Sequence, residues 1–227
     1  MDGVWRSGSF LGGLGAAARR ELGERGELVS FERGALLIEE GDSTSDVFVL
    51  CSSYVKVTAS LPGGGWTLVA VRMSGDLVGE LAGMSGAPRS ASVIACGTGP
   101  VTALRLRWSD FDQVRQARPE VLRQLQESVS RKLAAATRRR VDYRRRSPAV
   151  RLARVLVEMA DDFGQSVRGR EVILPMDLKH LEWGELIGVS ESTAYRALRE
   201  LRDLVDAQHR RVIVTDLTGL RALAEQE

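Results

Sequence analysis

Residues Val78–Val93 read VGELAGMSGAPRSASV, and the interpretation of the rest of the chain depends on this stretch. It begins with Gly79 and Glu80, passes through a loop rich in glycine, and reaches Arg89 and Ser90 before small and β-branched residues. Glycine lets the backbone approach a ligand closely, and the planar guanidinium of arginine suits a phosphate. The stretch therefore predicts a loop that binds a phosphate.

The side chains of this loop favour one class of phosphate ligand. Arg89 can bind a phosphodiester, and Ser90 adds a hydroxyl and a backbone N–H. Glu80 would repel a phosphate, but its carboxylate can accept a hydrogen bond from a sugar hydroxyl. One acid for a ribose and one arginine for a phosphodiester outline a cyclic nucleotide site; an ordinary β-hairpin with a surface arginine is the alternative. Because the loop is expected to face a pocket, substitutions at Arg89 or Glu80 should leave the fold intact.

The motifs GEL (79–81) and PRSASV (88–93) resemble the phosphate-binding cassette of cyclic-nucleotide-binding domains. More narrowly, the chain resembles the bacterial regulator family of the cyclic-AMP receptor protein and the fumarate–nitrate regulator. The resemblance implies cyclic AMP, or cyclic GMP, as an allosteric effector. Relatives add a Thr-Ser pair from a long helix and an arginine one turn earlier, where this chain has Ala136-Thr137 and Lys132. The ligand residues implied are Gly79, Glu80, Leu81, Arg89, Ser90, Lys132 and Thr137.

Two positions depart from the family pattern. Ser53 stands where the family usually has a glycine, which predicts a strained turn or a reshaped pocket wall. Val78 stands where a bulky aromatic residue is common. On the long helix, Ala136 loses one base contact of relatives and Thr137 keeps one. This loss leaves open a degenerate pocket, either independent of ligand or specific for another small molecule.

Composition excludes several other functions. The chain has 227 residues and is 44% hydrophobic, but it has no run of about 18 apolar residues and no signal-like N-terminus, so we expect a cytoplasmic protein without a membrane partner. Its two cysteines are too few for a cubane iron–sulfur cluster. The only histidines, His180 and His209, lie late in the chain, which excludes a histidine-held metal or haem in the first half. No metal is expected.

The first 108 residues predict a β-roll. Residues 9–26 read as a short helix that ends at Gly26. Short apolar or alternating runs separated by glycine-containing turns then predict strands. These runs are 28–31, 35–40, 46–50, 54–59, 66–72, 90–95 and 101–106. Together with the helices that follow, they place the chain in the α+β class, with residues 1–108 as a cyclic-nucleotide-binding domain.

A long helix is predicted from Pro119 to about Arg146, with Ser109 as the N-cap of the element before it. Apolar residues recur along it at three- and four-residue spacing, which favours a two-stranded coiled coil. The stripe consists of Leu122, Leu125 or Gln126, Val129, Leu133, Ala136, Arg140 and Tyr143. In the family this helix forms the homodimer interface. Residues 109–147 are therefore interpreted as a dimerisation helix ending in a hinge at Ser147-Pro148.

The end of this helix is strongly basic. Residues 131–154 contain ten Arg or Lys and a single acid, Asp142. Residues 109–227 carry 22 basic and 19 acidic side chains, against 10 and 11 in residues 1–108. Three roles remain open for the run 138–146. It can be a solvated helix face, contact nucleic-acid phosphates, or pair with acids of the C-terminal domain.

Residues 148–227 predict a winged helix-turn-helix domain. After an amphipathic helix over 150–163 and a strand at 172–175, the segment 181–203 has two helices joined at Gly188-Val189-Ser190. Ser190 is a candidate N-cap, and Arg210–Val214 reads as a wing with a basic tip. A plain helical hairpin is the alternative.

The outward face of the second helix predicts contacts with double-stranded DNA. Arg196 suits guanine, Glu191 can accept from cytosine, and Ser192 is permissive. The family's first two readers are an arginine and a glutamate, so a different target sequence is expected here. Thr193, Arg199 and Arg211 are candidate phosphate contacts. The predicted DNA-binding residues are Glu191, Ser192, Thr193, Tyr195, Arg196, Arg199 and Arg211.

The sequence therefore predicts a homodimeric, cyclic-nucleotide-responsive transcription regulator, with RNA polymerase as a further partner implied by the family. A sensor that docks on a protein partner is a second class, which salt-dependent DNA binding would distinguish. An enzyme is not expected, because the chain has no Ser-His-Asp set, no metal cluster and no paired acids with an assigned role.

Overall fold

A computed structural model of the chain describes residues 5–163, 165–167, 171–174, 176, 178–208 and 211–226. The chain forms two compact units, residues 1–133 and 134–227. Their boundary lies within one long helix. The three-part division at 108/109 and 147/148 stays a prediction.

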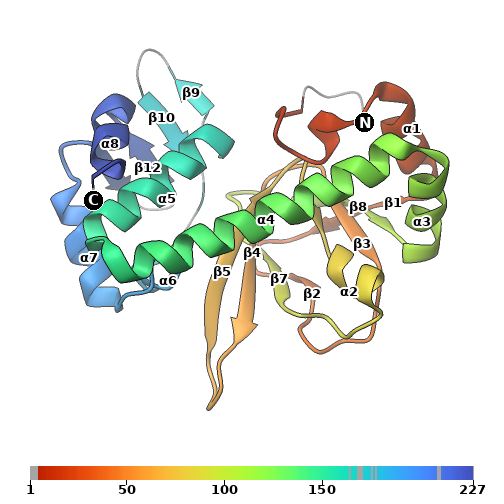
Figure 1. The fold of residues 1–227 in the computed structure, drawn as a ribbon, viewed down its shortest axis with the longest axis horizontal. Helices are drawn as coiled ribbons and strands as arrows, with labels where there is room; N and C mark the ends of the chain where they lie inside the picture. Colours follow the sequence, from red (N-terminus) through yellow and green to blue (C-terminus); the bar gives the residue numbers. More distant parts are fainter. Residues whose placement is uncertain are drawn as a thin grey trace. The chain divides into compact units, whose positions relative to one another are not determined.

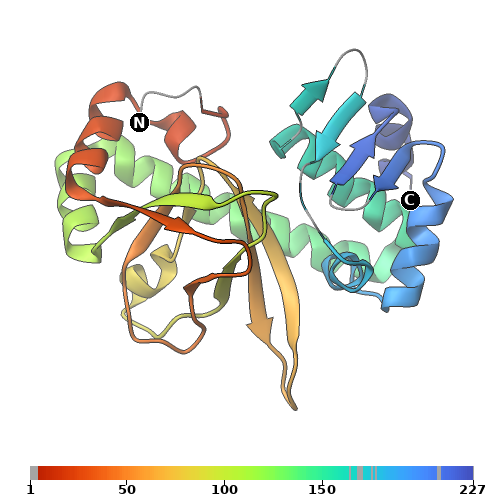
Figure 2. The same cartoon turned by 180° about the vertical axis from the view of Figure 1, so that it is seen from behind.

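The first unit is a β-roll made of two four-stranded antiparallel sheets (Figure 2). Their strand orders are β1-β8-β3-β6 and β2-β7-β4-β5. Every predicted strand is present, because alternating apolar residues cover the inside of the roll and glycines permit the turns. The bounds are β1 Glu27–Phe31, β2 Leu36–Ile38, β3 Val47–Leu50, β4 Tyr54–Ser60, β5 Trp66–Met73, β6 Leu77–Val78, β7 Ser92–Ala95 and β8 Val101–Leu106.

Three local features of this unit differ from expectation. The two-residue strand β6 pairs with β3 and was not predicted. The helix α2 (Glu80–Ser85) lies where a loop was expected. Residues 9–26 form a 3₁₀ turn, η1 (Leu11–Gly13), and a separate helix α1 (Ala16–Arg25). A continuous helix is interrupted there because Leu14 is extended.

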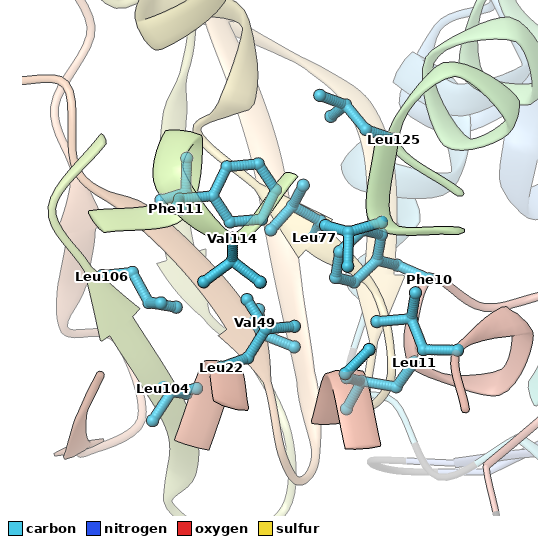
Figure 3. Packing of buried hydrophobic residues seen from close by; sticks show 14 residues of the cluster. Phe10, Leu11, Leu22, Val49, Leu77, Leu104, Leu106, Phe111, Val114 and Leu125 are labelled. Carbon is cyan, nitrogen blue, oxygen red and sulfur yellow. The ribbon is translucent and has the colours of Figure 1, made fainter. Parts of the chain in front are cut away.

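A hydrophobic cluster fixes the helices of the first unit against its sheets (Figure 3). It combines residues of η1, α1, β3, β8, α3 (Trp108–Ala117) and the start of α4 (Pro119–Arg145). The prediction of Ser109 as an N-cap is wrong, since α3 already begins at Trp108 and Arg107 is its N-cap residue. The proline at the start of α4 is where the sequence placed it.

Two sides of α4 differ in burial, which corrects the predicted stripe. Val121, Gln124, Leu125 and Ser128 are buried, and Leu125 belongs to the cluster in Figure 3. Leu133, in contrast, is 67% exposed. Leu125 is therefore part of the chain's own core and not of a surface seam.

The second unit contains a four-stranded sheet, in the order β11-β12-β10-β9, and helices that include a helix-turn-helix pair (Figure 1). The fold class is confirmed. The final helix α8 was not predicted, although Asp216 caps it by accepting a hydrogen bond from Gly219 N at 3.0 Å. The basic wing tip at Arg210 lies outside the described residues. The bounds are α5 Pro148–Phe163, β9 Gln165–Val167, β10 Glu171–Leu174, α6 His180–Ile187, α7 Glu191–Glu200, β11 Val205–Gln208, β12 Arg211–Val214 and α8 Leu217–Ala224.

Candidate ligand-binding cassette and nucleic-acid interface

Gly79 lets the backbone turn from β6 into α2 at the point where Arg89 approaches. Its φ of 85° is left-handed, and a Cβ there would lie 2.8 Å from an Arg89 guanidinium nitrogen and 2.9 Å from the carbonyl oxygen of Asp46. Both the dihedral angle and the close contact require glycine. The cassette is thus a tightly packed turn.

Arg89 lies inside this turn and is 4% exposed. Its guanidinium donates to Gly79 O at 2.8 Å, Asp46 O at 2.7 Å and Thr44 Oγ1 at 3.2 Å. These bonds join the loop before β3 to the cassette. Arg89 is therefore not a group that merely faces a pocket, which was the ground for expecting the fold to tolerate its removal. Two partly buried carbonyl groups would lose their donor, so its removal should also cost stability.

Glu80 is 2% exposed and forms an ion pair with Lys132 of α4. The ammonium of Lys132 donates to Glu80 Oε1 at 2.8 Å and to Leu77 O at 2.7 Å. The sequence placed both residues in the ligand site but assigned them to different parts of the ligand. The structure brings them into direct contact, so Lys132 neutralises the acid expected to bind the ribose.

Burial affects both basic groups of the cassette. It lowers the pKa of the Lys132 ammonium, while the neighbouring Glu80 carboxylate acts in the opposite direction. It also lowers the pKa of the Arg89 guanidinium, against the influence of Asp46, Asp42 and Glu80. Arginine nevertheless stays protonated in proteins. The cassette therefore retains a positive group for an anion once Glu80 and Lys132 cancel.

Among the described residues, no hydrogen bond joins the other predicted ligand residues to Glu80, Arg89 or Lys132. Leu81 is exposed on α2, and Ser90 is exposed beside Arg89. Thr137 is exposed on α4 and belongs to the second unit, so its contact with a nucleotide base stays a prediction.

Ser53 bears out the expectation of strain. It is the non-glycine residue with a left-handed backbone among those described, with φ at 60°. Its hydroxyl occupies the space beside Gly97, where a Cβ would lie 1.6 Å from Ser53 Oγ. The chain thus tolerates serine in a glycine-like turn because its neighbour has no side chain.

In the second unit, α6 and α7 form the predicted helix-turn-helix. Gly188 ends α6 with a left-handed φ of 69°, and a Cβ on Gly184 would lie 2.6 Å from Val189 O. Ala194, Ala197 and Leu198 bury the inner face of α7. Small residues at the crossing and glycine at the turn allow the two helices to approach closely.

The outward face of α7 carries the predicted DNA-reading residues. Glu191, Ser192, Tyr195, Arg196 and Arg199 are all exposed. Arg211 is exposed at the start of β12.

Hydrogen bonds between side chains organise the N-terminal end of α7. Arg196 donates to Thr193 Oγ1 at 3.2 Å, and Ser190 Oγ lies 3.0 Å from the same atom. Ser190 is the N-cap residue, as predicted, but its side chain makes no capping bond to the backbone. Thr193 thus orients Arg196, a role that the sequence did not suggest.

Part of the arginine run 138–146 forms ion pairs with acids of the second unit. Asp142 accepts from Arg146 at 3.2 Å and from Arg154 at 2.9 Å, and Arg139 pairs with Glu158 at 3.6 Å. Of the three open alternatives, pairing with an acid of the C-terminal domain therefore applies to Arg139, whereas Arg146 pairs with Asp142 of its own helix. Arg140, Arg144 and Arg145 are exposed instead.

Two further kinds of site were searched for in the described part of the chain. No group of three or more His, Cys, Asp or Glu residues there could hold a metal ion, and Cys51 and Cys96 are not joined by a disulfide. None of the described helices combines the length and apolar character that crossing a membrane requires.

Comparison with known protein families matches both units. Residues 28–118 match the cyclic nucleotide-binding domain, and residues 150–223 match the Crp-like helix-turn-helix domain. These two matches include the cassette, α6 and α7.

Individual relatives agree with the family matches. The chain is 25% identical over 221 residues to the CRP-like cAMP-activated global transcriptional regulator of Mycobacterium tuberculosis, covering 95% of this chain and 96% of that protein. FixK2 from Bradyrhizobium japonicum has a similar fold, with a TM-score of 0.74, 19% identity and coverage of 89% and 98%. The c-di-GMP responsive global regulator CLP of Xanthomonas campestris gives a TM-score of 0.72, 17% identity and coverage of 88% and 99%.

Proposed function

Because the chain belongs to the CRP/FNR family of transcription regulators, we propose that it is a homodimer whose affinity for DNA is controlled by cyclic AMP bound at the cassette. The observation that supports this most directly is the cluster of Gly79, Glu80, Arg89 and Lys132. It combines one sugar-binding acid with a buried guanidinium at a left-handed glycine.

The charges of the cluster suit a cyclic phosphodiester, which carries one negative charge. Glu80 and Lys132 neutralise each other at 2.8 Å, and Asp46 pairs with Arg105 at 2.9 Å. Arg89 uses three donors for protein acceptors, and a guanidinium has five, so two N–H groups remain for a phosphate. The hydroxyl and backbone N–H of Ser90 would complete the anion site.

Glu80 can bind a ribose hydroxyl without releasing Lys132. A carboxylate accepts at both oxygens, and the described bond to Lys132 uses Oε1. Oε2 would accept from the ribose, while Lys132 holds the carboxylate in place and prevents it from repelling the phosphate.

Calorimetry of the full chain with cyclic AMP and cyclic GMP tests the ligand assignment. Arg89→Gln should weaken binding more than a hundredfold, since loss of a buried charge partner costs about 3–5 kcal/mol. Glu80→Gln should cost less, on the order of 1.5–3 kcal/mol for a hydrogen bond to a charged group. Arg107→Gln, which removes an arginine whose side chain is 76% exposed, is the matched control. Thermal melting of each variant separates loss of the ligand from loss of the fold.

Two results would contradict this assignment. If folded Arg89→Gln protein bound the nucleotide as tightly as wild type, the cassette would not hold the phosphate. If wild type bound neither nucleotide at millimolar concentration, the second candidate would apply, which is the same DNA-binding regulator with a degenerate or differently specific pocket. The closed Arg89 and Glu80 contacts and the fold similarity to a c-di-GMP responsive regulator support that candidate.

The DNA-binding assignment is tested separately by in-vitro selection. Wild type should select a motif that depends on the outward residues of α7. Arg196→Ala should relax one position of this motif, at a cost of roughly 1–3 kcal/mol for removal of a bidentate guanine contact. An unchanged motif would contradict the placement of the recognition helix.

A further inference from the structure

The last turns of α4 are fastened to the helix-turn-helix within the second unit. Tyr143 donates from its hydroxyl to Leu186 O at 2.9 Å, and a Cβ on Gly188 would lie 3.2 Å from the Tyr143 ring. Arg151 donates to Tyr143 O at 2.6 Å and to Ile187 O at 3.2 Å. The end of α4 is therefore held against the turn from which the recognition helix α7 starts.

The face of α4 opposite these contacts is basic. Arg140 and Arg144 are one helical turn apart, as are Val141 and Arg145, so the four residues share one surface. All three arginines are exposed, and Val141 is 56% exposed. We call Arg140, Arg144 and Arg145 the arginine face.

Neighbouring acids do not compensate this charge. Asp142 is the sole acid in residues 131–154, and it binds Arg146 and Arg154. Within the described part of the chain, no ion pair or hydrogen bond of the arginine-face side chains is found. Like charges one turn apart destabilise a helix slightly. The helix dipole stabilises basic residues in the last turn only, so it does not explain why an arginine stands at position 140.

We propose that the arginine face is a second phosphate-binding surface, which contacts the backbone of the same DNA duplex that α7 reads. The inference rests on the proposed function. Guanidinium groups bind phosphates with charge-assisted hydrogen bonds, and duplex DNA presents a dense row of phosphates. The face belongs to the same compact unit as α7, so its contacts become intramolecular once α7 has bound.

These contacts would position the protein without reading sequence. Phosphate contacts fix register and orientation, while base contacts specify. The arginine face would therefore extend the DNA-contacting surface beyond the predicted contacts Arg199 and Arg211. It should raise affinity for all duplexes alike.

The salt dependence of DNA binding by the full chain tests the proposal. The triple variant Arg140→Gln, Arg144→Gln, Arg145→Gln removes the charge and keeps good helix-forming residues. Its matched control replaces three exposed arginines of the first unit, Arg20, Arg123 and Arg131, by glutamine. Affinity for the selected operator and for an unrelated duplex is measured by fluorescence anisotropy between about 50 and 200 mM salt.

The slope of log K against log salt should become shallower by about 0.9 for each phosphate that the variant no longer neutralises. We expect a change of about 2–3 for the triple variant on both duplexes, no change in sequence preference, and no change for the control. If wild type binds its operator and the triple variant keeps the wild-type slope, the proposal is overturned but the proposed function is not. The face would then be assigned to an acidic protein partner or to none. A changed motif would also overturn it, since the face would then read bases. If wild type bound no duplex, both would fail.

Discussion

Glu80 and Lys132 lie 52 positions apart in the sequence, and their contact changes what each can contribute to a ligand. An isolated buried carboxylate would be costly and would oppose a phosphate. With Lys132 bound, Glu80 remains available as an acceptor at low electrostatic cost. This pair would allow an acid and the proposed anion site to lie within the same turn.

Ser53 and Gly97 form a pair at the residue scale that a double-mutant cycle can resolve. Gly97→Ala alone should destabilise the protein by about 1–3 kcal/mol through overpacking, because its Cβ would lie 1.6 Å from Ser53 Oγ and 3.0 Å from Ser53 Cβ. In a Ser53→Gly background both atoms are removed, and the same substitution should cost much less. Urea unfolding of the four proteins measures the coupling. Additive effects would show that the two residues do not share this space.

Tyr54 gives a pH-dependent prediction. Burial raises the pKa of Tyr54 to about 12 from its usual value of 10.0. The folded state thus retains the phenol proton longer than the unfolded state, and stability present below pH 10 should be lost as pH rises from about 10 to 12. The total loss is at most about 3 kcal/mol.

Tyr54→Phe isolates this effect from other groups. Below pH 10 the free energies of unfolding of wild type and variant should differ by a constant. From about pH 10 to 11.5 wild type should lose stability relative to the variant, as measured by denaturant unfolding at each pH. Parallel curves throughout this range would contradict the assignment to Tyr54.

At the scale of elements, α4 presents different residues to the core and to solvent. Leu125→Ala should lower the free energy of unfolding by about 2–5 kcal/mol, because the side chain is 1% exposed within the main cluster. Leu133 is 67% exposed, so Leu133→Glu should leave the stability of the single chain nearly unchanged, apart from any stabilisation lost with the dimer.

The two substitutions should also differ in their effect on assembly. If the exposed stripe of α4 forms the proposed homodimer seam, Leu133→Glu places a charge within it and should yield monomers in light scattering. Arg131→Glu, exposed on another side of α4, should leave the dimer intact. A dimeric Leu133→Glu protein would exclude this seam.

The stripe also has an identifiable end. Arg140 would bring like charges together across a seam, and Tyr143 packs against its own helix-turn-helix. The apolar seam should therefore stop near Ala136. This is shorter than the stripe predicted from spacing.

For the whole molecule, the two compact units contain the two predicted activities, nucleotide binding in residues 1–133 and DNA binding in residues 134–227. If cyclic AMP tightens DNA binding by some factor, saturating operator DNA must tighten cyclic AMP binding by the same factor. Typical couplings are about 5- to 150-fold. Titration of cyclic AMP into free and DNA-saturated protein measures this coupling factor.

Arg196→Ala provides the control for this coupling. It should bind operator poorly and show little effect of the same DNA on nucleotide affinity. Equal cyclic AMP affinity in free and operator-saturated wild type would show that the nucleotide, although bound, does not regulate DNA binding.

Local patterns of the sequence determined the predicted strands of the β-roll, the cassette, the helix-turn-helix and which residues of α7 face outward. Such features depend on neighbouring residues, because a left-handed glycine turn or a three-four apolar period is set within a few positions. Short elements such as β6 and α2 were not predicted, since two to six residues carry too little periodicity.

The tertiary structure alone decided which partner each charged group and each helix face would have. Leu125 and Leu133 fit the same apolar stripe, and only packing by η1, α1 and α3 places one in the core and leaves the other exposed. The same holds for the bond of Arg89 to the Asp46 carbonyl before β3, for Lys132 on Glu80, and for Tyr143 at the turn of the helix-turn-helix. Each of these contacts joins residues more than 40 positions apart, so their proximity follows from the fold and not from spacing along the chain.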